Sequence, residues 1–211
     1  MRGSIQLRQR ATVGLIAVTV LVTLGIWLTG NLANAGTAMG FIAARVGGLA
    51  ISPAVPMWLT PLSATLVHAD FLHLLFNLVL FAYCGRQVEA MLGAGPVVAL
   101  YLVGAYSAAA GQYMLDPASM VPAIGASGAI SALVGAYAVS FGKPKKIVAS
   151  LRLNRWLNIA WLLAAWVVLQ WMVGYLGQQQ GVTIAIGAHV GGFIAGVLLQ
   201  RPLLLWRYRK A

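Results

Sequence analysis

The chain has 211 residues, of which 61% are hydrophobic and only 8% are charged. A soluble globular protein carries about 25% charged residues, so this composition excludes that class and predicts a single all-α membrane domain. The net charge of +11 does not indicate nucleic-acid binding, because the basic residues lie between apolar segments and at the two ends. The lone Cys84 excludes an internal disulfide.

The first apolar segment, at about 11–30, follows a short basic N-terminus at 1–11. A cleaved signal peptide is the alternative interpretation, because Ala33-Asn34-Ala35 resembles a cleavage site. The apolar core of about 18 residues is longer than the roughly 7–15 that are typical of a signal peptide. We therefore expect a retained first membrane span after a cytoplasmic N-terminus.

Residues 31–69 mix glycines, prolines, Trp58 and apolar patches that are too short to cross a membrane. Glycine and proline punctuate a chain into short pieces, and tryptophan favours the membrane interface. The segment is therefore expected to be a structured loop of short helices that lies partly in the interface.

Five further apolar segments are long enough to cross a bilayer core of about 30 Å as helices. They lie at about 71–92, 96–115, 125–141, 156–176 and 184–204. With the first segment they predict one six-helix membrane domain over residues 12–205, followed by a basic tail at 206–211. No internal repeat indicates the inverted halves of a secondary transporter.

The basic residues of this arrangement lie almost entirely on one side. Every Lys and Arg except Arg45 falls on the side of the N-terminus, and the densest group is Lys143, Lys145, Lys146, Arg152 and Arg155. The positive-inside rule then predicts that both termini are cytoplasmic and that the basic segments lie against anionic lipid heads.

Four polar side chains on three predicted spans reach one level near the outer surface. At 1.5 Å per residue, Ser127 lies roughly 24 Å and His189 roughly 27 Å from the cytoplasmic end. His73 and Asn77 begin the second span and share one helical face. Polar groups in lipid face the bundle interior, which makes these residues candidates for function.

Each of these residues also has a structural interpretation. Ser127 could be a small packing residue, and His73 and Asn77 could form hydrogen bonds between helices. His68 lies in the preceding loop and is expected to be a structural hydrogen-bonding group, and Glu89 to belong to a structural polar cluster. Metal ligation by the three histidines is disfavoured, because no cysteine or carboxylate follows at ligand spacing.

Together the four residues predict nucleophilic catalysis. A serine becomes a nucleophile when a histidine takes its proton, so Ser127 and His189 are the expected pair. The backbone N–H of Ser127 and the side chains of His73 and Asn77 would stabilise the resulting oxyanion. No carboxylate is placed to orient His189, which predicts a Ser–His dyad; the acids are Asp70, Glu89 and Asp116.

Rows of small residues mark the helices that carry the expected dyad. Gly192 and Gly196 follow His189, and Gly128 and Gly135 follow Ser127. Such rows let two backbones approach closely, which a short hydrogen bond between compact side chains requires.

The sequence resembles the rhomboid family of intramembrane serine proteases over about residues 55–200. The resemblance rests on a G-x-S-x motif at 125–128, an A-H-x-x-G-x-x-x-G motif at 188–196 and an H-x₄-H-x₃-N run at 68–77. Gly85 and Glu89 also resemble the polar cluster lower on the second helix of that family.

The resemblance implies that Ser127 is the nucleophile, that His189 is the general base and acid, and that His73 and Asn77 are oxyanion donors, supported by Gly125 and His68. It implies a half-embedded helical hairpin before His68. Some members have a tyrosine four residues after the serine, where this chain has Ser131.

The resemblance further implies the minimal six-helix bacterial form, in the bacterial inner membrane, with the active site open to the extracytoplasmic side. Its partners would be transmembrane protein substrates and the lipid bilayer, with no cofactor, metal or nucleic acid. The alternative is a non-catalytic rhomboid-like protein that binds or escorts membrane helices; loss of the serine or histidine would mark it, and both are present. A channel or transporter is disfavoured, because no charged residue lies mid-membrane.

Overall fold

A computed structural model describes residues 9–52, 54–142, 145–179 and 184–209 of the chain. Within this part the regular secondary structure is helical, with one isolated bridge between Phe41 and Ala123, so the prediction of an all-α chain is confirmed there. Some residues used in the sequence argument lie outside the described part: Arg2, Arg8, Lys143 and Lys210 of the expected cytoplasmic basic set, and Pro53.

The long helices overlap the six ranges that hydropathy selects. They are α1 (Arg10–Leu28), α4 (Phe71–Leu80) continued through the π-helical turn η5 (Phe81–Gly85) into α5 (Arg86–Leu92), α6 (Ala94–Leu115), α7 (Ser127–Phe141), α8 (Leu151–Gln179) and α9 (Ile186–Arg207). Helix α8 extends beyond its range at both ends. The segment between α1 and α4 contains short helices, as expected: α2 (Leu32–Met39), η2 (Ala43–Gly47), η3 (Met57–Leu59), α3 (Thr60–Ser63) and η4 (Ala64–Leu66).

Four helical stretches in the described part are long and apolar enough to cross a membrane, by length and composition alone. They are Arg10–Leu28, Phe71–Leu92, Ala94–Leu115 and Ile186–Arg207. Helix α7 is a shorter apolar helix of 15 residues; at 1.5 Å per residue it spans about 22 Å, less than the bilayer core of about 30 Å. Helix α8 has 29 residues.

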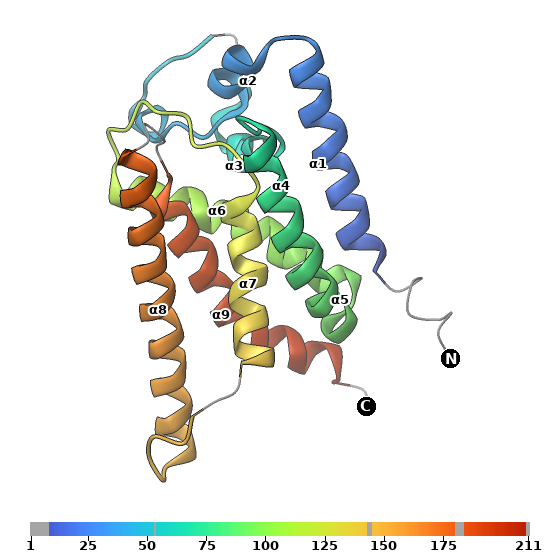
Figure 1. The fold of residues 1–211 in the computed structure, drawn as a ribbon, viewed down its shortest axis with the longest axis vertical. Helices are drawn as coiled ribbons and strands as arrows, with labels where there is room; N and C mark the ends of the chain where they lie inside the picture. The colour runs from blue at the N-terminus through green and yellow to red at the C-terminus, as the bar shows by residue number, and fades with distance from the viewer. Residues whose placement is uncertain (1–8, 53, 143–144, 180–183, 210–211) are drawn as a thin grey trace.

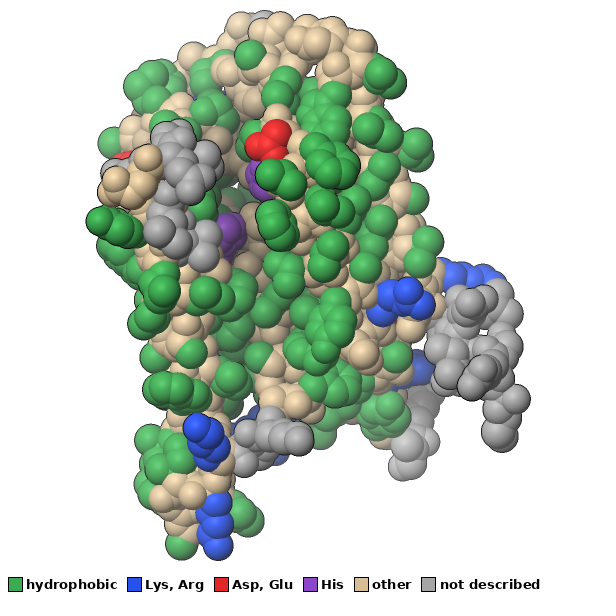
Figure 2. All heavy atoms as spheres, viewed as in Figure 1, with side chains coloured by type: hydrophobic (Ala, Val, Ile, Leu, Met, Phe, Trp, Pro, Cys, Tyr) green, Lys and Arg blue, Asp and Glu red, His purple; other side chains and the backbone are tan. Residues whose placement is uncertain are grey.

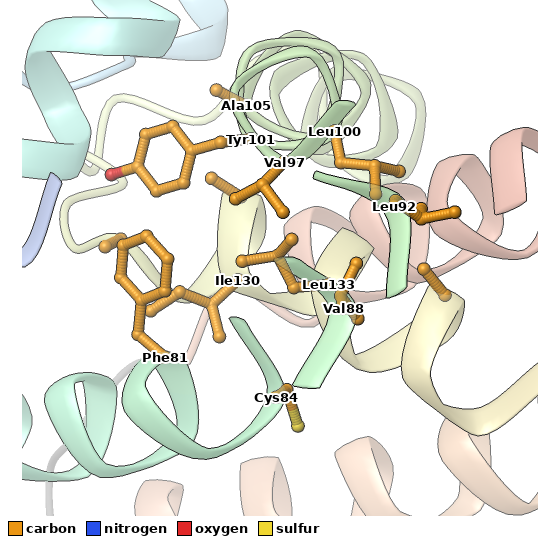
Figure 3. Close-up of a cluster of buried hydrophobic side chains, with 13 residues drawn as sticks. Phe81, Cys84, Val88, Leu92, Val97, Leu100, Tyr101, Ala105, Ile130 and Leu133 are labelled. Carbon is orange, nitrogen blue, oxygen red and sulfur yellow. The ribbon is translucent and has the colours of Figure 1, made fainter. Parts of the chain in front are cut away.

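Helices α6, α7 and α9 form the centre of the molecule and make the most extensive contacts with one another. Figure 1 shows α1 and α8 on opposite sides of this centre, with α9 passing behind α7. The apolar core joins α6 and α7 to the α4–α5 helix, with Phe81, Val88, Leu100, Ile130 and Leu133 buried in one cluster (Figure 3). The site described below lies at the end of α7 and α9 where both helices begin.

Helix α1 is attached to this centre by a buried carboxylate. Glu89 is 1% exposed and accepts hydrogen bonds from the backbone N–H groups of Ala11 and Thr12, at 3.0 and 2.8 Å, and from the Thr12 hydroxyl at 2.6 Å. A carboxylate at a helix N-terminus satisfies donors that the helix itself leaves free. Glu89 thus joins α5 to the start of α1.

The surface separates apolar from basic side chains. Figure 2 shows hydrophobic side chains over most of the face that it presents, and Lys and Arg side chains in the lower half of this view. Large apolar side chains of α1 and α8 are exposed on the protein surface, among them Leu21, Leu28 and Trp171. Such a belt is typical of a lipid-facing surface.

Candidate active site

Ser127 is the first residue of α7, and the glycine two residues earlier sets the turn that leads into it. Gly125 has φ +103°, a backbone conformation that favours glycine. Its N–H donates to the Ala64 carbonyl at 2.9 Å, and a Cβ at this position would lie 2.5 Å from His73 Nε2. Both the backbone angle and the neighbouring imidazole therefore require glycine here.

His189 lies in the first turn of α9 and faces Ser127. The distance between His189 Nε2 and Ser127 Oγ is 2.7 Å, which is a short hydrogen bond for a nitrogen–oxygen pair. The structure therefore brings together the two residues that the sequence selects as nucleophile and base.

The close approach of α7 and α9 depends on glycines that leave no room for a side chain. A Cβ at Gly192 would overlap the carbonyl oxygen of Gly128, and a Cβ at Gly196 would overlap that of Ala132. In the other direction, a Cβ at Gly135 would overlap the carbonyl oxygen of Phe193. We call this contact the glycine seam, formed by Gly128, Gly135, Gly192 and Gly196.

The other ring nitrogen of His189 contacts Gln170 of α8. Gln170 is buried, and its Oε1 lies 2.6 Å from His189 Nδ1. Gln170 is not among the site residues predicted from the sequence. One signal could have found it: Gln170 is a polar side chain in the middle of the predicted span at 156–176, and the rule that selected His73 and Asn77 applies to it equally.

His73 lies at the edge of the site, and Asn77 lies one turn further along α4. The Asp70 carboxylate caps α4 by accepting from the His73 N–H at 2.8 Å. Asn77 Nδ2 donates to the His73 carbonyl at 2.7 Å, while its buried Oδ1 has no partner among the described residues. The structure places His73 against Gly125 but records no hydrogen bond from Asn77 to the serine or to His189.

His68 is fully buried behind the site and connects α1 to the turn before Ser127. Its Nε2 accepts from the Ala126 N–H at 3.4 Å, so its Nδ1 carries the proton and donates to the Thr23 hydroxyl at 3.0 Å. Thr23 in turn donates to the Leu66 carbonyl at 3.0 Å. Burial, with a smaller contribution from nearby His73, lowers the pKa of His68 from 6.5 to about 4.

Ser131, one turn after Ser127, does not turn toward His189. Its hydroxyl donates to the Ser127 carbonyl at 2.8 Å, within α7. An aromatic residue from α8 lies beside His189 instead. Trp166 Nε1 donates to the His189 carbonyl at 3.3 Å, and its ring stacks on Phe193 with centroids 5.0 Å apart.

A small cavity of about 40 Å³ opens beside Ser127, lined largely by alanine and glycine. Its lining includes Ala64, Ala105, Ala108, Gly125 and Gly128. Figure 2 shows histidine side chains within a hollow on the outer part of the molecule. Among the residues that the structure describes, no group of three or more His, Cys, Asp or Glu side chains could hold a metal ion.

The first residues of α7, Ser127 and Gly128, line this cavity. The first N–H groups of a helix have no partner within it, and among the described residues no side chain caps α7. These N–H groups lie at the positive end of the helix dipole, which favours negative charge. The arrangement can therefore activate a serine hydroxyl and stabilise an anion next to it.

Residues 55–206 match the Rhomboid domain. The chain is 30% identical over 137 residues to the rhomboid protease GlpG of Yersinia pestis (strain Pestoides F), which covers 65% of this chain and 45% of that protein. It is 30% identical over 134 residues to the rhomboid protease GlpG of Photorhabdus laumondii, covering 64% of this chain and 43% of the relative.

The matches thus span less than half the length of these curated relatives. The Rhomboid domain, in contrast, covers most of this chain, from the short helices before His68 to the end of α9. This chain therefore belongs to the rhomboid family.

Proposed function

We propose that this chain is an intramembrane serine endopeptidase that cleaves transmembrane proteins within or near their membrane helix. The observation that carries the proposal is the 2.7 Å hydrogen bond between Ser127 Oγ and His189 Nε2. A serine that is merely a packing residue has no need of a buried imidazole as its acceptor.

In the proposed reaction, Ser127 Oγ attacks the carbonyl carbon of the scissile peptide bond while His189 Nε2 takes the hydroxyl proton. The carbonyl oxygen becomes an oxyanion, which accepts hydrogen bonds from the Ser127 N–H and from the side chains of His73 and Asn77. When the C–N bond breaks, His189 returns the proton to the leaving amine. Water then attacks the acyl-enzyme, with His189 again acting as base, and releases Ser127.

We propose that the site faces the extracytoplasmic side of a six-span domain whose termini are cytoplasmic. Helices α7 and α9 both begin at the site, and basic residues lie beyond their opposite ends: Lys145 and Lys146 after α7, and Arg207 and Arg209 at the end of α9. This polarity supports the orientation that the positive-inside rule predicts. The relatives named above come from bacteria, which supports a bacterial inner membrane.

The substrate must present an extended peptide to Ser127. A helical substrate hides its carbonyl groups in hydrogen bonds, so it must first unwind near the outer face of the membrane. The short length of α7, about 22 Å against a bilayer core of about 30 Å, and the non-helical turn before Ser127 support a site that can receive it there. We therefore expect substrates with glycine, proline or polar residues near the cleavage point.

The test is cleavage of a model transmembrane substrate in liposomes by the native chain and by Ser127→Ala and His189→Ala. Both variants should lose cleavage while remaining folded by circular dichroism. Ser140→Ala is the matched control, because Ser140 lies on the same helix and its hydroxyl donates to the Ala136 carbonyl at 2.7 Å. Cleavage by Ser127→Ala would refute the proposal, and binding of substrate helices by an inert native chain would indicate an escort.

A further inference from the structure

Helix α8 meets α9 through a row of residues that lie one turn apart. Trp166, Gln170 and Gly174 follow each other at intervals of four and so share one face of α8. Trp166 stacks on Phe193, Gln170 contacts His189, and a Cβ at Gly174 would meet the Ile186 side chain. The three contacts follow one another along α8 and, in the opposite direction, along α9. They fix the register of α8, and Gln170 makes the middle contact.

The chemistry of the Gln170 contact is fixed by its atoms. An amide oxygen only accepts hydrogen bonds, so His189 Nδ1 must carry the proton at the 2.6 Å contact with Gln170 Oε1. His189 Nε2 is then unprotonated and can accept from Ser127 Oγ at 2.7 Å. The opposite tautomer would place an N–H against the serine and could not take its proton.

We propose that Gln170 is a positioning residue that holds His189 in the tautomer and ring orientation needed to deprotonate Ser127. This proposal rests on the proposed function of the site and adds a third member to it. A neutral carboxamide here takes the orienting place that an aspartate occupies in a Ser–His–Asp triad. An amide suits a buried position, because an unpaired carboxylate in an apolar environment is far more costly to bury.

The location of Gln170 gives the interaction a second consequence. Ser127 and His189 are held on α7 and α9, whereas their orienting group comes from α8, whose contacts lie mainly with α9. The acceptor for His189 Nδ1–H and the Trp166 donor to the His189 backbone carbonyl both belong to α8. The contacts that hold α8 against α9 are therefore also the contacts that orient the base.

The test compares two buried glutamines. Gln170→Met removes the acceptor at nearly constant length, and Gln170→Glu keeps an acceptor oxygen. Gln200→Met is the matched control, because Gln200 is also buried and lies on α9 about three turns beyond His189. Three readouts are taken: kcat and KM on a transmembrane substrate, the rate of Ser127 labelling by a small fluorophosphonate, and the ¹⁵N spectrum of histidine-labelled protein, which has only three histidines.

The expected result for Gln170→Met is a kcat and a labelling rate at least about ten-fold below those of the native chain, the effect of losing one orienting hydrogen bond. KM should stay unchanged, and the His189 ¹⁵N signals should change from a single Nδ1–H tautomer to a mixture. Gln170→Glu should label faster than Gln170→Met, and Gln200→Met should match the native chain in every readout.

The inference is overturned if Gln170→Met labels as fast as Gln200→Met, if its defect lies only in KM, or if His189 keeps a single tautomer without Gln170. Gln170→Met and Gln200→Met decide the matter by themselves where Gln170→Glu does not fold. An inert native chain refutes the proposed function instead; the His189 tautomer in Gln170→Met then still tests this inference, because the spectrum requires no activity.

Discussion

The two sides of α9 show two different ways to hold a helix in place. On the α7 side, glycines bring the backbones so close that no side chain fits between them. On the α8 side, the contact consists of side chains: a tryptophan stacked on a phenylalanine, and a glutamine hydrogen-bonded to a histidine. The nucleophile and base share the first contact, and the orienting glutamine belongs to the second.

The two kinds of contact differ in how easily they can separate. Backbone contact in a lipid environment is favourable through close packing and cannot loosen by rotamer changes. Side-chain contacts can separate and re-form as rotamers change. We therefore expect substitutions in the glycine seam to disturb the pair Ser127 and His189 more than substitutions in the α8 contact.

The largest effect should come from a valine in the glycine seam. In Gly192→Val, the new side chain meets the backbone of Gly128, which cannot move without shifting α7. We expect a loss of about 3 kcal/mol or more in the free energy of unfolding, at the upper end of overpacking effects. Unfolding in mixed micelles, followed by circular dichroism, measures the loss.

The matched change on α8 is Gly174→Val. There the new side chain meets the flexible end of Ile186, which can rotate away, so we expect a loss below about 1 kcal/mol. Equal losses for the two valine variants would show that α8 is held as rigidly as α7, and would remove the contrast between the two sides of α9.

A similarly large effect should appear with pH, through His68. The folded chain holds the pKa of His68 at about 4, below its ordinary value of 6.5, so the unfolded chain binds the proton more readily. The free energy of unfolding should be insensitive to His68 above pH 6.5. It should fall as the pH drops from 6.5 to 4, by about 3 kcal/mol in total.

The control for this titration is His68→Gln, whose amide can accept from Ala126 and donate to Thr23 without titrating. Stability curves of the two chains, measured from pH 7 to pH 4.5, should diverge as the pH falls, with the native chain losing stability faster. Parallel curves would show that His68 is not held neutral in the fold.

The smallest effect should come from Trp166→Phe. The phenyl ring keeps the stack on Phe193, while the donor to the His189 carbonyl is lost. The hydrogen bond is long at 3.3 Å, so we expect a decrease in kcat of about two- to three-fold and little change in the free energy of unfolding. A decrease as large as that of Gln170→Met would shift the orienting role from the glutamine to the tryptophan.

Hydropathy and the depth of polar residues were sufficient to predict the helical ranges and to select Ser127 and His189 as neighbours. They could not predict the length of α7, because the apolar run beginning at Gly125 does not reveal that its first residues form a turn with φ +103°. The estimated depth of Asn77 in the membrane also did not reveal its hydrogen-bond partner. Asn77 lies at the level of Ser127 but donates a hydrogen bond within its own helix.

Gln170 was missed for a different physical reason. From the sequence, only a carboxylate was expected to be able to orient His189, and none lies at its depth. An amide oxygen performs the same geometric task without charge, and its partner depends on how α8 is rotated about its axis. That rotation is set by the stack of Trp166 and by Gly174. The periodicity of the sequence does not show that these two residues, among the others on α8, make the contacts.

The hydrogen-bonded chain through His68 bears on where protons can travel during turnover. Each donor along it points away from the nucleophile: Ala126 to His68, His68 to Thr23, and Thr23 to a backbone carbonyl. A Grotthuss wire requires every link to be able to reverse, and a peptide N–H at one end with a carbonyl at the other cannot do so. This hydrogen-bonded chain therefore cannot relay protons between the site and bulk water.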